Sequence, residues 1–101
     1  MATHTQVIQR PFMPVGNHTA NSSLSSAVTL TNPGTGDAII LQALTQNVRM
    51  RVDNGTPTAS AGFQLKAGDP AVIIPVSAST VVKVIEETSG GAIQYQWIRY
   101  D

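Results

Sequence analysis

The sequence of 101 residues contains no cysteine, which excludes a disulfide framework and any thiolate metal site. Charge is scarce as well: six Lys and Arg balance six Asp and Glu, and charged residues make up 12% of the chain, against about 25% in an ordinary soluble domain. A chain without net charge lacks the field that draws proteins to nucleic acids or anionic membranes. The longest apolar run, residues 71–76, is too short to span a bilayer. We therefore expect no nucleic-acid partner and no membrane partner.

Groups that could perform catalysis are few and scattered. The two histidines, His4 and His18, have no Asp or Glu nearby at the spacing of metal ligands. Glu86 and Glu87 are adjacent in an expected strand, so their side chains should point to opposite faces, and no Gly-x-Ser-x-Gly motif is present. The other carboxylates lie in expected turns or at the chain end: Asp37, Asp53, Asp69 and Asp101. The sequence predicts no metal, no cofactor and no enzymatic activity.

Branched and hydroxylated residues are abundant. Val, Ile and Thr supply 29 residues, and their stiff side chains favour strands. From Ser26 onward apolar residues recur with a period of two, between clusters of turn-forming residues. We expect strands at residues 27–30, 38–44, 47–52, 71–76, 80–86 and 92–100, with an edge segment or ordered loop at 56–65. This spacing predicts an all-β fold, a single antiparallel β-sandwich of jelly-roll type over residues 26–101.

Two local patterns sharpen this prediction. Asp53-Asn54-Gly55 is a strong hairpin signal, because Asn and Gly accept the positive φ angles of a tight turn. The apolar phase of the alternating strands predicts these core residues: Val48, Met50, Val52, Val82, Val84 and Trp97. Tyr95 and Trp97 alternate with glutamines, which favours packing in the core over an exposed aromatic platform.

Residues 1–25 differ from the rest of the chain, since neither the helix period nor the strand period holds there. They carry one formal charge, and Pro11 and Pro14 prevent a helix. We interpret residues 1–25 as an extended amino-terminal arm; the alternative is a first strand packed on its own domain, followed by a loop. An arm of this composition would bind another subunit or a larger shell through its apolar side chains, Val7, Ile8, Phe12, Met13 and Val15.

The strand 48–52, the Asp53-Asn54-Gly55 turn, the segment 58–65 and the turn Ala67-Gly68-Asp69-Pro70 follow one another in a characteristic order. Together with the strand 81–85 and the Gly90-Gly91 turn, this order resembles the small all-β decoration or cement proteins that stabilise the capsids of tailed bacteriophages. The resemblance covers residues 38–100 and does not include residues 1–25.

The resemblance implies a structural virion protein, a homotrimer that binds the major capsid protein at junctions between capsomers. Its expected location is the outer capsid surface of the virion, and its assembly takes place in the host cytoplasm. Phage fibre proteins also use small β-domains, and a fold does not fix a function. A carbohydrate- or receptor-binding module of a phage fibre therefore stays open as the alternative, and an exposed aromatic platform would favour it.

Overall fold

A computed structural model of the chain describes residues 11–101, and these residues contain eight β-strands and no helix. The strands are β1 (Phe12–Asn21), β2 (Val28–Leu30), β3 (Ala38–Ala43), β4 (Val48–Arg51), β5 (Phe63–Leu65), β6 (Val72–Pro75), β7 (Val82–Glu86) and β8 (Ile93–Tyr100). The all-β class expected from the sequence is therefore confirmed for these residues.

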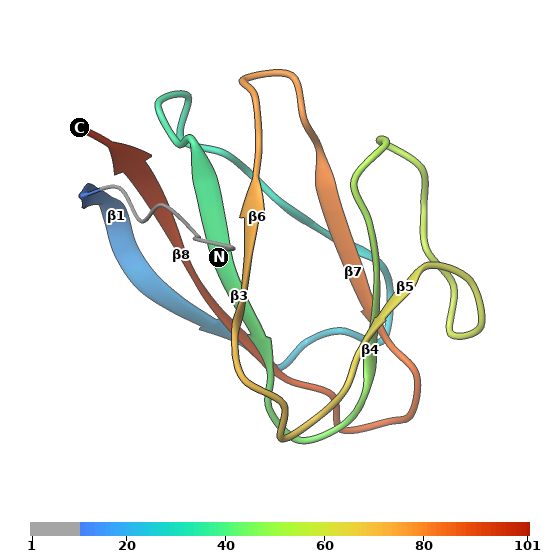
Figure 1. Ribbon diagram of the computed structural model, residues 1–101. Helices are drawn as coiled ribbons and strands as arrows, with labels where there is room; N and C mark the ends of the chain where they lie inside the picture. Colours follow the sequence, from blue (N-terminus) through green and yellow to red (C-terminus); the bar gives the residue numbers. More distant parts are fainter. Residues whose placement is uncertain (1–10) are drawn as a thin grey trace, which may run out of the picture.

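The strands form two four-stranded sheets, and neighbouring strands within each sheet are antiparallel (Figure 1). The first sheet has the order β1-β8-β3-β6 and the second the order β2-β7-β4-β5. Both sheets combine strands from the beginning, the middle and the end of the chain. The last strand, β8, lies between β1 and β3 and is hydrogen-bonded to both.

One hydrophobic core joins the two sheets. The first sheet contributes Ile39, Leu41, Ala43, Ile93 and Trp97 to it, and the second contributes Leu30, Val48, Met50, Val82 and Val84. Leu24, in the loop between β1 and β2, is also fully buried in this cluster. No polar or charged side chain is buried among the described residues, so apolar contact between the sheets is the main stabilising interaction.

Five of the six predicted core residues are buried, and Val52 is the exception. Val52 is half-buried and packs against the edge of the core, because β4 ends at Arg51. The predicted tight hairpin at Asp53-Asn54-Gly55 is also wrong. Asn54 has the expected positive φ of 66°, but β4 pairs with β5 only after a longer loop that begins at Val52, and Asp53 forms a bridge to Val81 of the neighbouring segment.

Phe12–Asn21 does not extend away from the domain, in contrast to the arm interpretation for this part of residues 1–25. It is the edge strand β1, which pairs with β8. A bulge between Val15 and Thr19 interrupts the pairing, and Gly16 adopts a φ of 73° within it. The Gln96 amide donates to the carbonyls of Val15 (3.3 Å) and Gly16 (3.1 Å), which satisfies backbone groups that the bulge removes from the ladder.

The amino-terminal part of the predicted arm, including Val7 and Ile8, lies outside the described residues. The described part follows the alternative that the sequence left open, a first strand packed on its own domain. Sequence patterns could not choose between the two, because the partner strand β8 is about 80 residues away along the chain.

Trp97 lies at the centre of the core, with 4% of its surface exposed. We expect Trp97→Ala to lower the free energy of unfolding by about 3–5 kcal/mol, because it removes a large buried side chain and leaves a cavity between the sheets. Urea unfolding followed by circular dichroism measures this loss. Phe63→Ala is the matched control, since Phe63 is 67% exposed and its truncation should have little effect. Equal losses for the two variants would contradict a core role for Trp97.

Candidate functional site

The free edge of β1 holds the described part of the predicted partner-binding set. Phe12 is 50% exposed and Met13 is 43% exposed, so both side chains offer apolar surface to a partner. Val15 is half-buried and packs against the core opposite Trp97, so it offers less. The structure therefore separates the predicted residues: Phe12 and Met13 lie at the surface of the edge strand, whereas Val15 anchors that strand to the core.

Backbone groups of β1 also point to the side on which no other strand of residues 11–101 pairs with it. The Asp101 N–H donates to the Pro11 carbonyl (3.2 Å), and backbone groups of successive residues in a strand point to opposite sides. The N–H and C=O of Phe12 therefore point away from β8, toward the free edge. At Pro14, two residues further, only the C=O can bond there, because proline has no N–H. An edge of this kind can accept an additional strand.

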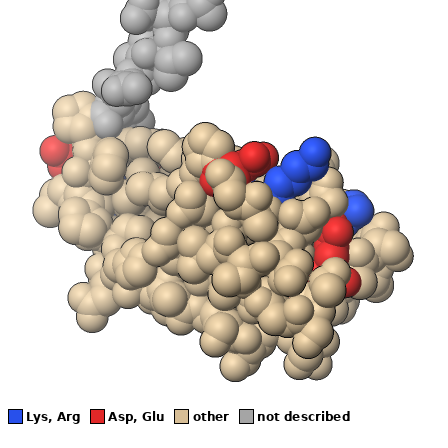
Figure 2. Space-filling model, turned by 90° about the horizontal axis from the view of Figure 1, so that it is seen from below, with Lys and Arg blue, Asp and Glu red and all other residues tan. Residues whose placement is uncertain are grey.

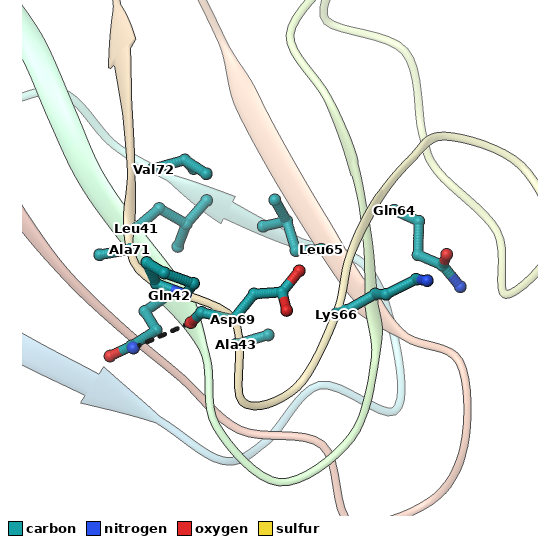
Figure 3. A pocket seen from close by; sticks show the side chains of 10 residues that line it. Leu41, Gln42, Ala43, Gln64, Leu65, Lys66, Asp69, Ala71 and Val72 are labelled. Carbon is teal, nitrogen blue, oxygen red and sulfur yellow. Dashed lines mark hydrogen bonds between the residues drawn. The ribbon is translucent and has the colours of Figure 1, made fainter.

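A groove of about 320 Å³ opens between β5 and β6, the edge strands on the same side of the two sheets (Figure 3). Leu41 of β3, Leu65 of β5 and Val72 of β6 give it apolar walls. Lys66 and Asp69, from the loop that joins β5 to β6, form part of its polar rim. Sequence reasoning missed this groove because no local pattern shows which two edges meet.

A row of polar side chains crosses the outer face of the first sheet. His18 Nε2 lies 3.0 Å from Gln94 Oε1, the Gln94 amide donates to Gln42 Oε1 (2.6 Å), and the Gln42 amide donates to the Asp69 carbonyl (3.1 Å). A shallow hollow of about 150 Å³ lies beside this row, and its lining includes Ile40. The row joins β1, β8, β3 and the loop before β6, so it ties all four strands together on the side away from the core.

Both arginines of the second sheet, Arg49 and Arg51 of β4, form ion pairs. Arg49 donates to Glu87 Oε2 (2.6 Å), which also accepts a hydrogen bond from the Gln64 amide (2.8 Å). These bonds, first that of Gln64 and then that of Arg49, hold the pKa of the Glu87 carboxyl below its usual value. Figure 2 shows how few charged side chains one face of the molecule carries. Such pairs stabilise the sheet locally and leave little unbalanced charge for a ligand.

A second ion pair follows β4. Arg51 donates to both carboxylate oxygens of Asp53, through Nε (3.0 Å) and Nη2 (2.6 Å). The Gly55 N–H also donates to Asp53 Oδ1 (3.1 Å). Two hydrogen bonds, first that from Arg51 and then that from the Gly55 N–H, lower the pKa of Asp53 from 3.8 to about 2. Because the Asp53 side chain is exposed, this pair contributes only modestly to stability.

The aromatic residues do not form a common platform. Trp97 is buried and Tyr95 is half-buried against the core. Phe63, the most exposed aromatic, lies on β5 beside a hollow of about 350 Å³ that Arg51 also lines. Phe12 lies on β1, in the other sheet. Phe12 is the cross-strand partner of Tyr100 on β8, which is half-buried. The exposed aromatic side chains of residues 11–101 are therefore divided between this pair and Phe63 on the other sheet.

Groups suited to catalysis do not converge within the described part of the chain. No three His, Asp or Glu residues there lie close enough together to hold a metal ion. Glu86 accepts a hydrogen bond from the Gly91 N–H (3.1 Å), whereas Glu87 binds Arg49, so the two adjacent carboxylates have different partners. Residues 11–101 also contain no helix of the length and hydrophobicity needed to cross a membrane.

Comparisons with family models, with curated proteins and with solved structures found no match to this chain.

We expect Asp53→Asn to be less stable than the parent protein at pH 7 by a small amount. Folding lowers the pKa of Asp53, so the stabilisation is present above pH 3.8 and is lost as the pH falls toward 2. The difference between the two proteins should therefore close between about pH 3.8 and pH 2. Urea unfolding at pH 7, 3 and 2 measures it.

Asp69→Asn is the control for this experiment, because the Asp69 carboxylate has no hydrogen-bond or ion-pair partner among residues 11–101. It should match the parent protein at pH 7. A deficit of Asp53→Asn that persisted undiminished at pH 2 would contradict a role for the charge of Asp53.

Proposed function

We propose that this protein is a structural virion protein that decorates and stabilises the capsid of a tailed bacteriophage. In this proposal it is a homotrimer seated on the outer capsid surface, where it binds the major capsid protein at junctions between capsomers. It acts by binding and not by catalysis.

The strand order carries this proposal. Eight antiparallel strands in the orders β1-β8-β3-β6 and β2-β7-β4-β5 are the arrangement expected for a jelly-roll sandwich, in which two Greek keys fold over each other. Jelly rolls are common in viral capsid proteins and in lectins, which supports both functions considered from the sequence. This argument rests on an analogy between folds.

The distribution of apolar surface favours a capsid-binding protein over a carbohydrate-binding module. Trp97 fills the core and is not offered to a sugar, whereas Phe12 and Met13 are exposed on a strand edge, where another protein can add backbone hydrogen bonds. Small domains without disulfides also gain stability from subunit interfaces, because association buries apolar area that a monomer exposes. The proposed partner-binding surface consists of Val7, Ile8, Phe12, Met13 and Val15.

One observation supports the alternative, a carbohydrate- or receptor-binding module. The row of His18, Gln94 and Gln42 presents amide and imidazole groups beside a shallow hollow, and sugars are bound by groups of this kind. Each of these side chains already has a hydrogen-bond partner within the domain, so a sugar would have to displace these contacts. This makes the row a weaker candidate than the edge of β1.

We expect phage particles grown without this protein to lack a density at capsomer junctions, and purified protein to restore it. Electron microscopy of the two particle preparations measures occupancy, and heating them measures resistance to rupture. Density at a fibre or tail tip in place of the capsid surface would support the alternative and contradict the proposal.

Deletion of residues 2–10 tests the amino-terminal part of the binding surface. It removes Val7 and Ile8 but retains all of β1, so we expect a melting temperature close to that of the full chain and a lower occupancy on particles. Circular dichroism and electron microscopy give the two readouts. Unchanged occupancy would contradict a role for Val7 and Ile8 in binding the capsid, and Phe63→Ala, which changes an exposed residue on the other sheet, is the control.

A further inference from the structure

The two free edges of the first sheet carry matching apolar side chains. At the β1 edge Phe12 is 50% and Met13 is 43% exposed, and at the β6 edge Val72 is 37% and Ile73 is 56% exposed. These four residues are most of the large exposed hydrophobic residues in the described part of the chain, and only Leu44 and Phe63 lie elsewhere. Opposite edges of one sheet, separated by β8 and β3 (Figure 1), therefore share the same unusual surface.

The exposed side chains also match in the face to which they point. Val72 pairs with Leu41, which lies in the core, so Val72 is on the core side of the sheet and Ile73 is on the outer side. Val15 packs on the core, so Met13, two residues earlier, is on the core side and Phe12 is on the outer side. Each edge thus has one uncovered apolar side chain on each face.

No other strand of the described part of the chain pairs with the backbone groups at these positions on either edge. The Val76 N–H donates to the Asp37 carbonyl (2.9 Å), which continues the register of β6 with β3. By alternation, the N–H and C=O of Ile73 point away from β3. The same alternation turns the N–H and C=O of Phe12 away from β8. Phe12 and Ile73 are therefore positions at which the two edges offer both a donor and an acceptor.

The direction of the strands allows the two edges to meet. The sheet contains four strands, each antiparallel to the next, so β1 and β6 run in opposite directions. If a second copy is placed beside the first in the same orientation, its β1 is antiparallel to the β6 of the first copy. A simple rotation about an axis roughly along the strands therefore continues the sheet from one copy to the next without any change in its hydrogen-bonding pattern.

We infer that copies of this chain associate head to tail through antiparallel pairing of β1 in one copy with β6 in the next, with Phe12 opposite Ile73 and Met13 opposite Val72. Phe12 and Ile73 then form a hydrogen-bonded pair that exchanges two backbone bonds, and Met13 and Val72 form the adjacent pair without hydrogen bonds. This inference deepens the trimer of the proposed function and rests on that assembly, but it does not depend on binding to a capsid.

This pairing also covers the groove between β5 and β6. Val72 forms part of its wall, so the Met13 side chain of the next copy lies at its β6 side. Methionine is flexible and fills irregular apolar gaps well. The same contact that joins two sheets thus also covers part of this groove.

Two prolines restrict the register. Pro14 and Pro75 lie on the free edges, where each presents a C=O but no N–H. A second copy slipped by two residues so that Phe12 lies opposite Pro75 would also place Pro14 opposite Ile73 and lose a donor in each pair, whereas the Phe12–Ile73 register places two complete positions opposite each other. Prolines at strand edges commonly prevent unwanted pairing, and here they disfavour this slipped register.

Cysteine pairs test the inference directly, because the chain has no cysteine of its own. In the proposed register the Cα atoms of residues 13 and 72 are about 4.5 Å apart, within the range of disulfides. The double variant Met13→Cys with Val72→Cys, treated with diamide, which is reduced as the two thiols are oxidised, should form intermolecular disulfides. A non-reducing gel should show dimers and trimers that disappear on reduction, and both sites are exposed enough for the variant to fold.

The matched control is Met13→Cys with Phe63→Cys, because Phe63 is more exposed than Val72 but lies on the other sheet. It should give far less cross-linked product. Equal cross-linking in the control, disulfide dimers of either single variant in equal amount, or a cysteine-free parent that sediments only as a monomer would overturn the inference.

The number of copies separates this inference from the proposed function. Cross-linked products that end at the trimer on the gel support both the pairing and the trimer. Cross-linked products larger than the trimer support the pairing and contradict the trimer, since a head-to-tail interface forms a filament when it does not close into a ring. Parent protein that forms trimers in solution but fails to restore density on phage capsids would leave the pairing intact and contradict the proposed function.

Discussion

The pairing of the first described strand with the last is the contact on which this structure depends. β8 lies between β1 and β3, and it carries Trp97 and Ile93 into the core on one face. On its other face it places Gln94 and Gln96 against His18 and the bulge of β1. Without β8, β1 has no partner and β3 loses one of its two neighbours. The first sheet is therefore complete only when the carboxyl-terminal residues are in place.

This dependence has a consequence for folding. Most of the stabilising contacts join residues far apart in the sequence, and such topologies fold slowly because loop closure costs entropy before the contacts form. The chain has no disulfide to reduce that cost. Side chains instead order the turns locally: Asn32 Oδ1 accepts hydrogen bonds from the N–H groups of Gly34 and Gly36, and its amide donates to the Gly36 carbonyl. Asn21 Oδ1 accepts from the Ser23 N–H in a similar turn. Short polar side chains thus stabilise the turns of this chain, a role that ion pairs and disulfides have in other proteins.

The sequence predicted those parts of the fold that local periodicity determines. Alternation assigned Val48, Met50, Val82 and Val84 to the core correctly, because a strand with one buried face repeats every two residues whatever its partner is. It misassigned Val52, because alternation does not show where pairing stops. The Asn-Gly signal correctly indicated a positive φ at Asn54 but not a tight hairpin, since the Arg51–Asp53 pair and the bridge from Asp53 to Val81 extend the loop.

Local sequence patterns predict even less of the candidate site. Composition identified Phe12 and Met13 as apolar residues in need of a partner, and the structure exposes both. Nothing local could place them on an edge strand, because that depends on pairing with β8. For the strand 71–76, Pro75 predicts a place at a sheet edge or a strand end, and the strand order confirms that β6 is an edge strand. No local pattern relates β6 to β1, and only the strand order shows that β1 and β6 form the two edges of the same sheet.

The edges of the first sheet combine exposed apolar side chains, which promote association, with residues that prevent it. Exposed apolar strand edges promote aggregation, and natural proteins usually protect them with charge, proline or bulges. This chain has little charge to use, and its edges carry a proline on each of β1 and β6 together with the bulge after Val15. If these features served only to prevent association, polar residues at Phe12 and Ile73 would protect the edges better. Apolar side chains beside these barriers are instead what selective pairing requires, because specificity comes from blocking the wrong registers as much as from stabilising the right one.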